Sequence, residues 1–473
     1  MPTVAELDSL LVIARALVIA FDPSRKGVSN GFARDLPLKA LEHGVKVVFV
    51  GTLAEIELLR AHSGTLPPEC VACLVSPAKH VVAEEAARHD PGPSCNFFLS
   101  LKGDPLSTSD EILIRRSFSD FRAVTLKSQT GGKSGARVYL VHAEPAADAD
   151  VNGNYTMPYF AKIDRLDKVR EEKRAFERFA SRYIPFSQRP NLELTRCVSG
   201  AKNGVLVGDF VEGALPLAKM VRPFGARQVI HSLFDDALAC FRQQAFANGK
   251  TINVREFWKE IVKPDRILDV HWQTAKTYGA KVSPSRLSAL IEKASFTYRA
   301  GPIHGDLNAE NVFARHNEAV LIDFCRATVG PLVSDLACLE VAVAFTEEAK
   351  SATADWLAEG GPYSSDPHFK EWRKHIDALF SLVPGQFAIV PPPSELPCRY
   401  AWIWSVSRQL RLMGHYLDRD DRSYAFILGL YLLRLCMYDD DPREGSPDRS
   451  MRGFAYSVGL ALISQSLKGA KSR

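Results

Sequence analysis

The chain has 473 residues, of which 46% are hydrophobic and 24% are charged. This composition is ordinary for a globular protein and excludes both a disordered chain and a small disulfide-stapled scaffold. The 59 Lys and Arg residues exceed the 55 Asp and Glu residues by four, so we expect neither a nucleic-acid partner nor an anionic membrane partner from charge.

Three short apolar runs predict a small α/β module at the beginning of the chain. They are ALVIAF at 16–21, KVVFV at 46–50 and VACLV at 71–75, and they have the β-branched composition of buried parallel strands. Residues 30–42 and 53–62, between them, carry leucines at helical spacing. Alternating strands and helices predict a doubly wound parallel sheet in residues 1–105. Pro, Gly and Ser accumulate at 91–108, as at a domain boundary.

The next segment predicts a compact α+β unit over residues 106–213. Its signals are strands at 123–126 and 137–141 on either side of the glycine turn GGKSG, a strand at 158–163 (PYFAKI), a charged helix at 167–183 and a strand at 204–210. Beyond residue 217 the patterns are mostly helical, which gives a third segment, 214–473.

The longest apolar stretch, residues 424–433 (YAFILGLYLL), is followed by Arg434. It is too short to span a bilayer and predicts a buried helix. The N-terminal MPTVAELD lacks the basic start of a signal peptide, and the nine cysteines are scattered and odd in number. We therefore expect a cytoplasmic protein with no membrane partner.

The strongest chemical signal is IHGDLNAENVFARHNEAVLIDF at residues 303–324, where Asp306, Asn311 and Asp323 follow one another at spacings of five and twelve. A turn followed by a strand that ends in Asp can bring all three into one pocket. A carboxylate such as Asp306 can orient an attacking hydroxyl and accept its proton, while an amide oxygen from Asn311 and a carboxylate from Asp323 suit Mg²⁺. Each residue alone is more typical of loop capping. The three together favour phosphoryl transfer.

The words HGDLNAENV and LIDF resemble the aminoglycoside phosphotransferase and choline kinase branch of the protein-kinase-like fold, and most closely its bacterial ternary complex associated phosphotransferase-like domains. The resemblance implies a bilobal α+β domain that uses ATP, with GTP not excluded, and Mg²⁺. It implies that His304 is a scaffold residue and that Asp335 braces the catalytic loop. Two departures from protein kinases favour the small-molecule kinase relatives. Asn308 stands two positions after the catalytic Asp, and Cys325 replaces the protein-kinase glycine after Asp323-Phe324.

The resemblance also implies nucleotide-binding groups in residues 106–213. The phosphate cradle would be the glycine turn, with Gly131, Gly132, Ser134 and Gly135. Lys162 would contact the nucleotide phosphates. Its partner on the next helix is Glu172 rather than Glu171, because Glu172 shares a helical face with Phe176. Residues 207–213 would form the hinge beside the adenine.

Residues 16–77 resemble the second half of a flavodoxin-like response-regulator receiver. Asp22 then occupies the phosphoacceptor position and Thr52 that of the switch hydroxyl. Ser76 stands where receivers carry Lys, and the acidic metal-binding segment is absent. These departures favour a degenerate module that binds a signalling protein or dimerises, and a turn-forming Asp22 is the plain alternative.

Two functions follow from these patterns. The first is an ATP- and Mg²⁺-dependent phosphotransferase acting on a hydroxyl of an unidentified small molecule or protein, with a regulatory module in front. The alternative is a catalytically silent pseudokinase and pseudo-receiver scaffold that binds nucleotide or partner proteins; a phosphorelay through Asp22 is a third option. Retention of every catalytic position favours the first, and the degraded receiver favours the second. No motif in residues 215–299 or 345–397 identifies the acceptor.

Overall fold

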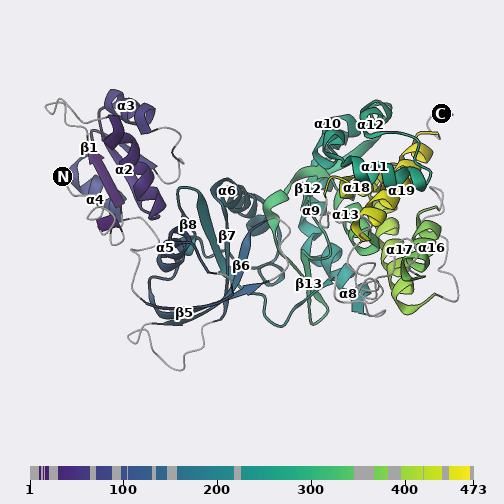
Figure 1. The fold of residues 1–473 in the computed structure, drawn as a ribbon, viewed down its shortest axis with the longest axis horizontal. Helices are drawn as coiled ribbons and strands as arrows, with labels where there is room; N and C mark the ends of the chain where they lie inside the picture. Colours follow the sequence, from purple (N-terminus) through teal and green to yellow (C-terminus); the bar gives the residue numbers. More distant parts are fainter. Residues whose placement is uncertain are drawn as a thin grey trace. The chain divides into compact units, whose positions relative to one another are not determined.

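The computed structural model describes residues 10–11, 14, 16–20, 30–63, 66, 71–87, 97–103, 105–129, 135–145, 157–217, 225–345, 367–381, 396–418, 420–438 and 447–468 (Figure 1). The chain divides into two compact units. The first unit comprises Met1–Arg174 and Pro190–Glu212, and the second comprises Ala175–Arg189 and Gly213–Arg473. Among the described helices, none is both long enough and apolar enough to cross a membrane.

The first unit begins with a three-stranded parallel sheet, drawn in purple in Figure 1. Its strands are β1 (Ala16–Ala20), β2 (Lys46–Gly51) and β3 (Val71–Val75), and its helices are α2 (Asn30–Glu42), α3 (Leu53–Ser63) and α4 (Lys79–Ala87). The predicted parallel strands are confirmed. Their predicted burial holds only for β2, because β1 and β3 each pair on one edge and leave Val18 42% and Val75 55% exposed. The described strands run in chain order, which does not establish a flavodoxin-like receiver.

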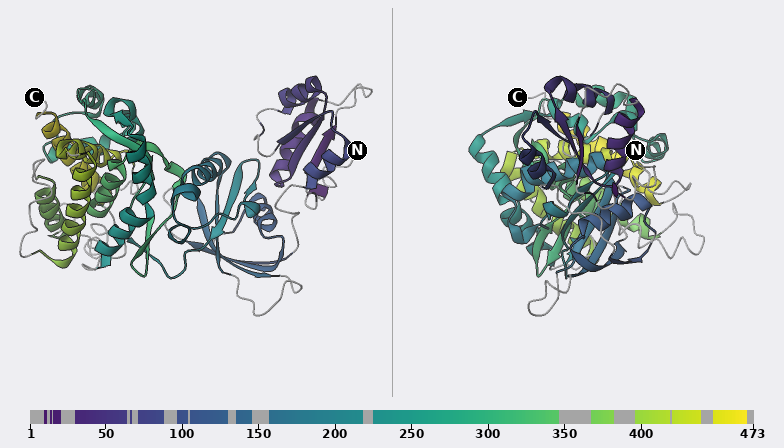
Figure 2. Two further views of the ribbon diagram at one scale, coloured as in Figure 1. Left: turned by 180° about the vertical axis from the view of Figure 1, so that it is seen from behind. Right: turned by 90° about the vertical axis from the view of Figure 1, so that its left-hand side faces the viewer.

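A six-stranded sheet forms the rest of the first unit, seen in blue to teal in the left view of Figure 2. In spatial order its strands are β4 (Phe98–Lys102), β5 (Phe121–Gln129), β6 (Arg137–Pro145), β7 (Tyr159–Arg165), β9 (Asn203–Asp209) and β8 (Val198–Ser199). All neighbours are antiparallel except β4 and β5. The strand β4 lies within the stretch that the sequence marked as a boundary. The predicted division at residue 105 stays a prediction.

The second unit is mainly helical. Its helices include α8 (Gly225–His231), η7 (Ser232–Ala237), α9 (Ala239–Asn248), α10 (Val254–Ile261), α11 (Asp269–Thr277), α12 (Pro284–Ile291), α13 (Val333–Phe345), α16 (Pro367–Phe380), α17 (Cys398–Asp418), α18 (Asp421–Leu435) and α19 (Pro447–Lys468). Two small sheets lie among them, in the orders β10 (Leu215–Pro216), β13 (Val312–Arg315), β14 (Glu318–Leu321), and β11 (Thr251–Asn253), β12 (Thr297–Ile303), β15 (Thr328–Pro331).

The helix α18 is the buried helix that the sequence predicts. Its residues from Ser423 to Leu433 are buried. Close packing against α19 depends on two glycines: a Cβ at Gly429 would lie 2.8 Å from the carbonyl oxygen of Gly459, and one at Gly459 would lie 2.9 Å from that of Gly429. Because neither position leaves room for a side chain, the two helices are held in one register.

A buried polar network joins four of these helices, α13, α16, α17 and α18. The Glu340 carboxylate on α13 accepts hydrogen bonds from Arg411 Nε of α17 at 2.7 Å and from the Tyr424 hydroxyl of α18 at 2.8 Å. Arg411 also donates to the carbonyl of Leu379 at 3.0 Å. Burial raises the pKa of Glu340, and these donors oppose the rise. Each carboxylate oxygen has a partner, so the burial of Glu340 is compensated.

The buried guanidinium of Arg116 connects two parts of the first unit, the helix after β4 and the N-terminal module. Arg116 on α5 (Thr108–Ser117) is fully buried, and its Nη2 donates to the carbonyls of Leu11 at 2.8 Å and Ala14 at 3.1 Å. Its Nε donates to the carbonyl of His43, at the C-terminal end of α2. A cation is favoured where a helix presents unpaired carbonyls. The buried charge is therefore held by backbone oxygens of the N-terminal module.

We predict that Arg116→Met lowers the free energy of unfolding of the first unit by about 3 kcal/mol, because three carbonyls, two of them in buried hydrogen bonds, lose a charged donor. Chemical denaturation followed by circular dichroism measures the loss. Arg122→Met is the matched control: Arg122 is 62% exposed and pairs with the exposed Glu144, so it should cost less than about 1 kcal/mol. Equal losses in the two variants would show that the Arg116 contacts do not stabilise the unit.

Candidate active site

The loop from His304 to Asn311 joins β12 to β13 in the second unit. The start of the loop is fixed by strand pairing, because Ile303, the last residue of β12, lies opposite Thr328 of β15. Gly305 has a φ of +77°, and a Cβ there would lie 2.3 Å from the carbonyl oxygen of Arg326. This position therefore requires glycine for its backbone conformation and for space.

The buried carboxylate of Asp335 holds this loop from the first turn of α13. Its Oδ2 accepts the backbone N–H of His304 at 2.8 Å, and its Oδ1 accepts that of Gly305 at 2.9 Å. Burial raises the pKa of Asp335, and His304 and the two N–H donors oppose this rise. The Asp335 side chain thus fixes the backbone of the two residues that precede Asp306.

The His304 side chain links the loop to the end of β14. It is fully buried, and its Nε2 lies 2.9 Å from the carbonyl oxygen of Ile322. Since a carbonyl only accepts, Nε2 carries the proton. The ring also packs against Phe324, with centroids 5.1 Å apart. These contacts support the interpretation of His304 as a scaffold residue.

The pairing of β13 with β14 brings Asn311 close to Asp323. Val312 lies opposite Leu321, and the N–H of Ile322 donates to the carbonyl of Asn311 at 3.0 Å. The Asn311 side-chain NH₂ donates to the carbonyl of Asp306 at 2.9 Å, which leaves its amide oxygen as the end that can bind a cation. Asp323 has a φ of +57°, a conformation uncommon for Asp and frequent at functional sites.

The donor set of Asn311 and Asp323 fits Mg²⁺. This ion is commonly bound by one or two carboxylate or amide oxygens, with phosphate oxygens and water completing its coordination. No group of three or more His, Cys, Asp or Glu side chains in the described part of the chain is arranged to hold a metal ion. A site with few protein ligands, of the kind used with a nucleotide, matches these residues.

Arg434 is a residue at this site that the sequence analysis did not assign. Its Nη2 lies 2.8 Å from Asp306 Oδ1, and its Nη1 is 3.4 Å from the carbonyl oxygen of Gly305. The side chains of Arg434 and Asp306 are 15% and 30% exposed. Burial lowers the pKa of Arg434, but the nearby acidic groups, Asp306 first among them and then Cys338, Tyr431 and Tyr438, together outweigh burial and raise it. The signal in the sequence was an Arg that ends an apolar helix.

In the first unit, Lys162 and Glu172 form an ion pair. Lys162 lies on β7 between the buried Ala161 and Ile163, and its Nζ is 2.7 Å from Glu172 Oε2 of α6 (Leu166–Ala175). Both side chains are 12% exposed. Glu171 is exposed. The structure thus pairs Lys162 with the carboxylate that lies on the buried side of the helix.

The remaining predicted site residues have less described geometry. Asp22, Gly131, Gly132 and Ser134 lie outside the described residues. Gly135 is exposed and has a φ of +76°. Thr52 directly precedes α3: its N–H donates to the Glu55 carboxylate at 2.7 Å, and its hydroxyl accepts from the Glu55 N–H at 3.4 Å. Its described contacts are those of a helix cap, and the receiver-like site stays a prediction.

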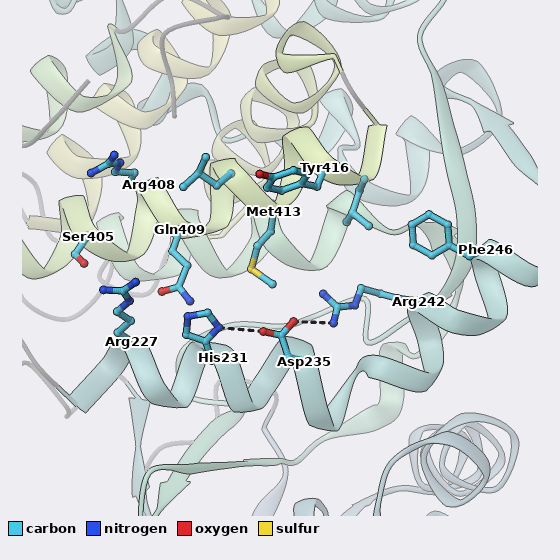
Figure 3. Close-up of a pocket in the computed structure, with 12 residues that line it drawn as sticks. Arg227, His231, Asp235, Arg242, Phe246, Ser405, Arg408, Gln409, Met413 and Tyr416 are labelled. Carbon is cyan, nitrogen blue, oxygen red and sulfur yellow. Dashed lines mark hydrogen bonds and ion pairs between the residues drawn. The ribbon is translucent and has the colours of Figure 1, made fainter. Parts of the chain in front are cut away.

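A separate groove of about 620 Å³ lies in the second unit (Figure 3). The helices α8, η7 and α9 form one wall and α17 forms the other. Asp235 accepts from Arg242 at 2.9 Å and is 3.0 Å from His231, as the dashed lines show. None of the residues from His304 to Asp323 lines this groove. It is therefore distinct from the candidate active site.

Comparisons with known proteins give a partial match. The family described as Ternary complex associated domain 9 matches residues 226–359, which include Asp306, Asn311, Asp323 and Asp335. Curated proteins give no match.

Solved structures that are similar to the chain include three small-molecule kinases. Aminoglycoside phosphotransferase APH(3'')-Id from Streptomyces rimosus is 16% identical, with 59% of this chain and 92% of that chain covered and a TM-score of 0.26. Amicoumacin kinase hAmiN is 12% identical, with coverage of 81% and 94% and a TM-score of 0.32. A microcompartment-associated aminopropanol kinase is 16% identical, with coverage of 74% and 94% and a TM-score of 0.30. The kinase-like expectation from the sequence is therefore carried by the chain's own residues, namely the Lys162–Glu172 pair and the segment from His304 to Asp323.

We predict that Asp335→Asn lowers the stability of the second unit by about 2 to 3 kcal/mol. Asn offers one acceptor oxygen in place of two, and its NH₂ would face a buried backbone N–H. Denaturant unfolding measures the change. Asp269→Asn, at an exposed position in the first turn of α11, is the matched control and should change stability by less than about 0.5 kcal/mol. Wild-type stability for Asp335→Asn would mean that the hydrogen bonds from His304 and Gly305 to Asp335 do not stabilise the loop.

Proposed function

We propose that the chain is an ATP- and Mg²⁺-dependent phosphotransferase that transfers the γ-phosphoryl group to a hydroxyl of a small molecule or protein. The observation that carries the proposal is the position of Asp306. It lies in the loop from His304 to Asn311, directly after the two residues whose N–H groups Asp335 accepts. The pairing of β13 with β14 brings Asn311 and Asp323 together at the end of that loop. GTP is the alternative phosphoryl donor. The acceptor stays unidentified.

In the proposed reaction, Asp306 is the base. Its Oδ1 is engaged by Arg434, which leaves Oδ2 to accept a hydrogen bond from the acceptor hydroxyl. The hydroxyl oxygen forms a bond to the γ-phosphorus as the bond to the β,γ-bridging oxygen breaks, ADP leaves, and the hydroxyl proton passes to Asp306 and then to water. Positioning and charge neutralisation, rather than covalent catalysis, supply the rate enhancement.

The other residues would bind the nucleotide. Asn311 and Asp323 would hold Mg²⁺, which when bound neutralises charge on the phosphates. Lys162, braced by Glu172, would contact the α- and β-phosphates, and backbone groups of the glycine turn at 131–135 would cradle them. The N-terminal module, which Arg116 attaches to α5, would regulate the enzyme.

We predict that Mg-ATP at about 5 mM raises the melting temperature of the wild-type protein by at least about 2 °C. Asp323→Ala should remove the metal-dependent part of this shift. Asp306→Asn should keep the shift but lower turnover by about 10² to 10⁴, because it removes the base. Thermal-shift measurements and radiolabelled ATP with a panel of amino alcohols, sugars, aminoglycosides and cell lysate provide the readouts. Nucleotide binding without labelled product would support the silent scaffold instead. No shift at all would contradict the phosphotransferase and leave only a scaffold that binds partner proteins.

We also predict that Lys162→Met weakens Mg-ATP binding by about tenfold or more, since one charge-assisted contact is worth about 1.5 to 3 kcal/mol. This variant leaves Glu172 without its cation, so Lys162→Met combined with Glu172→Gln separates affinity from stability. Titration calorimetry measures the affinity. Lys168→Met is the control, because Lys168 is a more exposed lysine on the neighbouring helix. Unchanged affinity in the folded double variant would remove Lys162 from the nucleotide site.

A further inference from the structure

The last turn of α18 carries a cation that is mostly buried. The helix is buried over the eleven residues from Ser423 to Leu433, and Arg434 follows directly. A guanidinium that is 15% exposed needs an anion or several acceptors to offset its lost hydration. Its partner is not on a neighbouring turn of the helix: it is Asp306, 128 residues earlier in the chain. The helix therefore brings a cation to the proposed base.

The contact has two points. Nη2 of Arg434 lies 2.8 Å from Asp306 Oδ1, and Nη1 is directed at the carbonyl oxygen of Gly305 at 3.4 Å, which is a long contact. The two acceptors belong to adjacent residues, Gly305 and Asp306. The guanidinium also lies 5.7 Å from the centroid of the Tyr431 ring. A planar fork held in this way restricts the rotation of the Asp306 side chain, which a single ammonium would do less well.

The other contacts of the loop fix its backbone. Asp335 accepts the N–H groups of His304 and Gly305, and Asn311 donates to the carbonyl of Asp306. Among the hydrogen bonds described for this loop, only the one from Arg434 reaches the Asp306 carboxylate. Backbone and side chain of the proposed base are thus held by different elements, α13 and α18.

The helix α18 does not depend on Arg434 for its own position. Tyr424 donates to Glu340 at 2.8 Å, the Tyr298 hydroxyl donates to the carbonyl of Ser423 at 3.0 Å, and Gly429 packs closely on Gly459. These contacts hold the helix at several points along its length. A purely structural role for an Arg at its end would duplicate them.

We propose that Arg434 is a positioning residue for Asp306, which holds one carboxylate oxygen so that the other faces the acceptor hydroxyl. The proposal rests on the phosphotransferase function above and adds a residue to it. A misplacement of about 1 Å in a reacting group can cost about 10²-fold in rate. Arg434 would therefore act on the catalytic step and leave nucleotide binding unaffected.

The test compares Arg434→Met, Arg434→Lys and Arg434→Ala in the full-length protein. Turnover is measured as Mg-ATP hydrolysis, or as transfer to the best acceptor of the panel, and Mg-ATP affinity is measured separately by calorimetry. Arg434→Met should lower kcat by about 10- to 100-fold and change Mg-ATP affinity by less than about twofold. Arg434→Lys should recover only part of the loss. Guanidinium ion added at millimolar concentration should restore part of the activity of Arg434→Ala.

The matched control is Arg422→Met on the same helix, where Arg422 pairs with Asp420; its kcat should equal that of the wild type. In the Asp306→Asn background, Arg434→Met should have no further effect on kcat, because it acts through Asp306. Loss of folded protein and of nucleotide affinity without guanidinium rescue would make Arg434 structural and overturn the proposal. Wild-type turnover in Arg434→Met would also overturn it and leave the phosphotransferase function intact. Absence of turnover in the wild type would overturn that function and this role together.

Discussion

The contact on which the site depends is the acceptance of two backbone N–H groups by the buried carboxylate of Asp335. It fixes the residues that precede Asp306 and so sets where the loop leaves β12. The same loop then passes into β13, whose pairing with β14 places Asn311 beside the segment that ends in Asp323. The proposed base and the two proposed cation ligands are thereby located by one side chain and one short hairpin. One side chain is sufficient because Asp335 binds the backbone N–H groups of the loop rather than its side chains.

Buried polar groups give the second unit its specificity. An apolar helix such as α18 could pack in several rotational settings with similar burial. The contact of the Tyr424 hydroxyl with the Glu340 carboxylate is satisfied in one setting only. Replacing such groups with apolar residues often costs little stability, so their contribution is chiefly to define a unique arrangement. In this protein, that arrangement directs a helix end toward the proposed catalytic residue.

The features that the sequence predicts well are those encoded locally. The parallel strands of the N-terminal module and the buried helix α18 follow from runs of apolar residues, and the spacing of Asp306, Asn311 and Asp323 reflects one loop and one hairpin. Pairing between distant segments is less accessible. The strand β4 exists because it pairs with β5, in surroundings rich in Pro and Gly, and the partner of Arg434 lies 128 residues away. The exposure of β1 and β3 depends on sheet order, which their own residues do not specify.

The contacts of Arg116 have a consequence for how related sequences can vary. Its acceptors are backbone carbonyls of Leu11, Ala14 and His43, and every residue type carries a carbonyl. Substitutions at those three positions can change the side chains and keep the acceptors, whereas Arg116 itself has no equivalent replacement. Selection that preserves the attachment of the N-terminal module would then restrict the residue type at position 116 of α5, but not at the three positions that provide the carbonyls. Relatives could retain the same attachment while their N-terminal modules diverge beyond recognition by sequence.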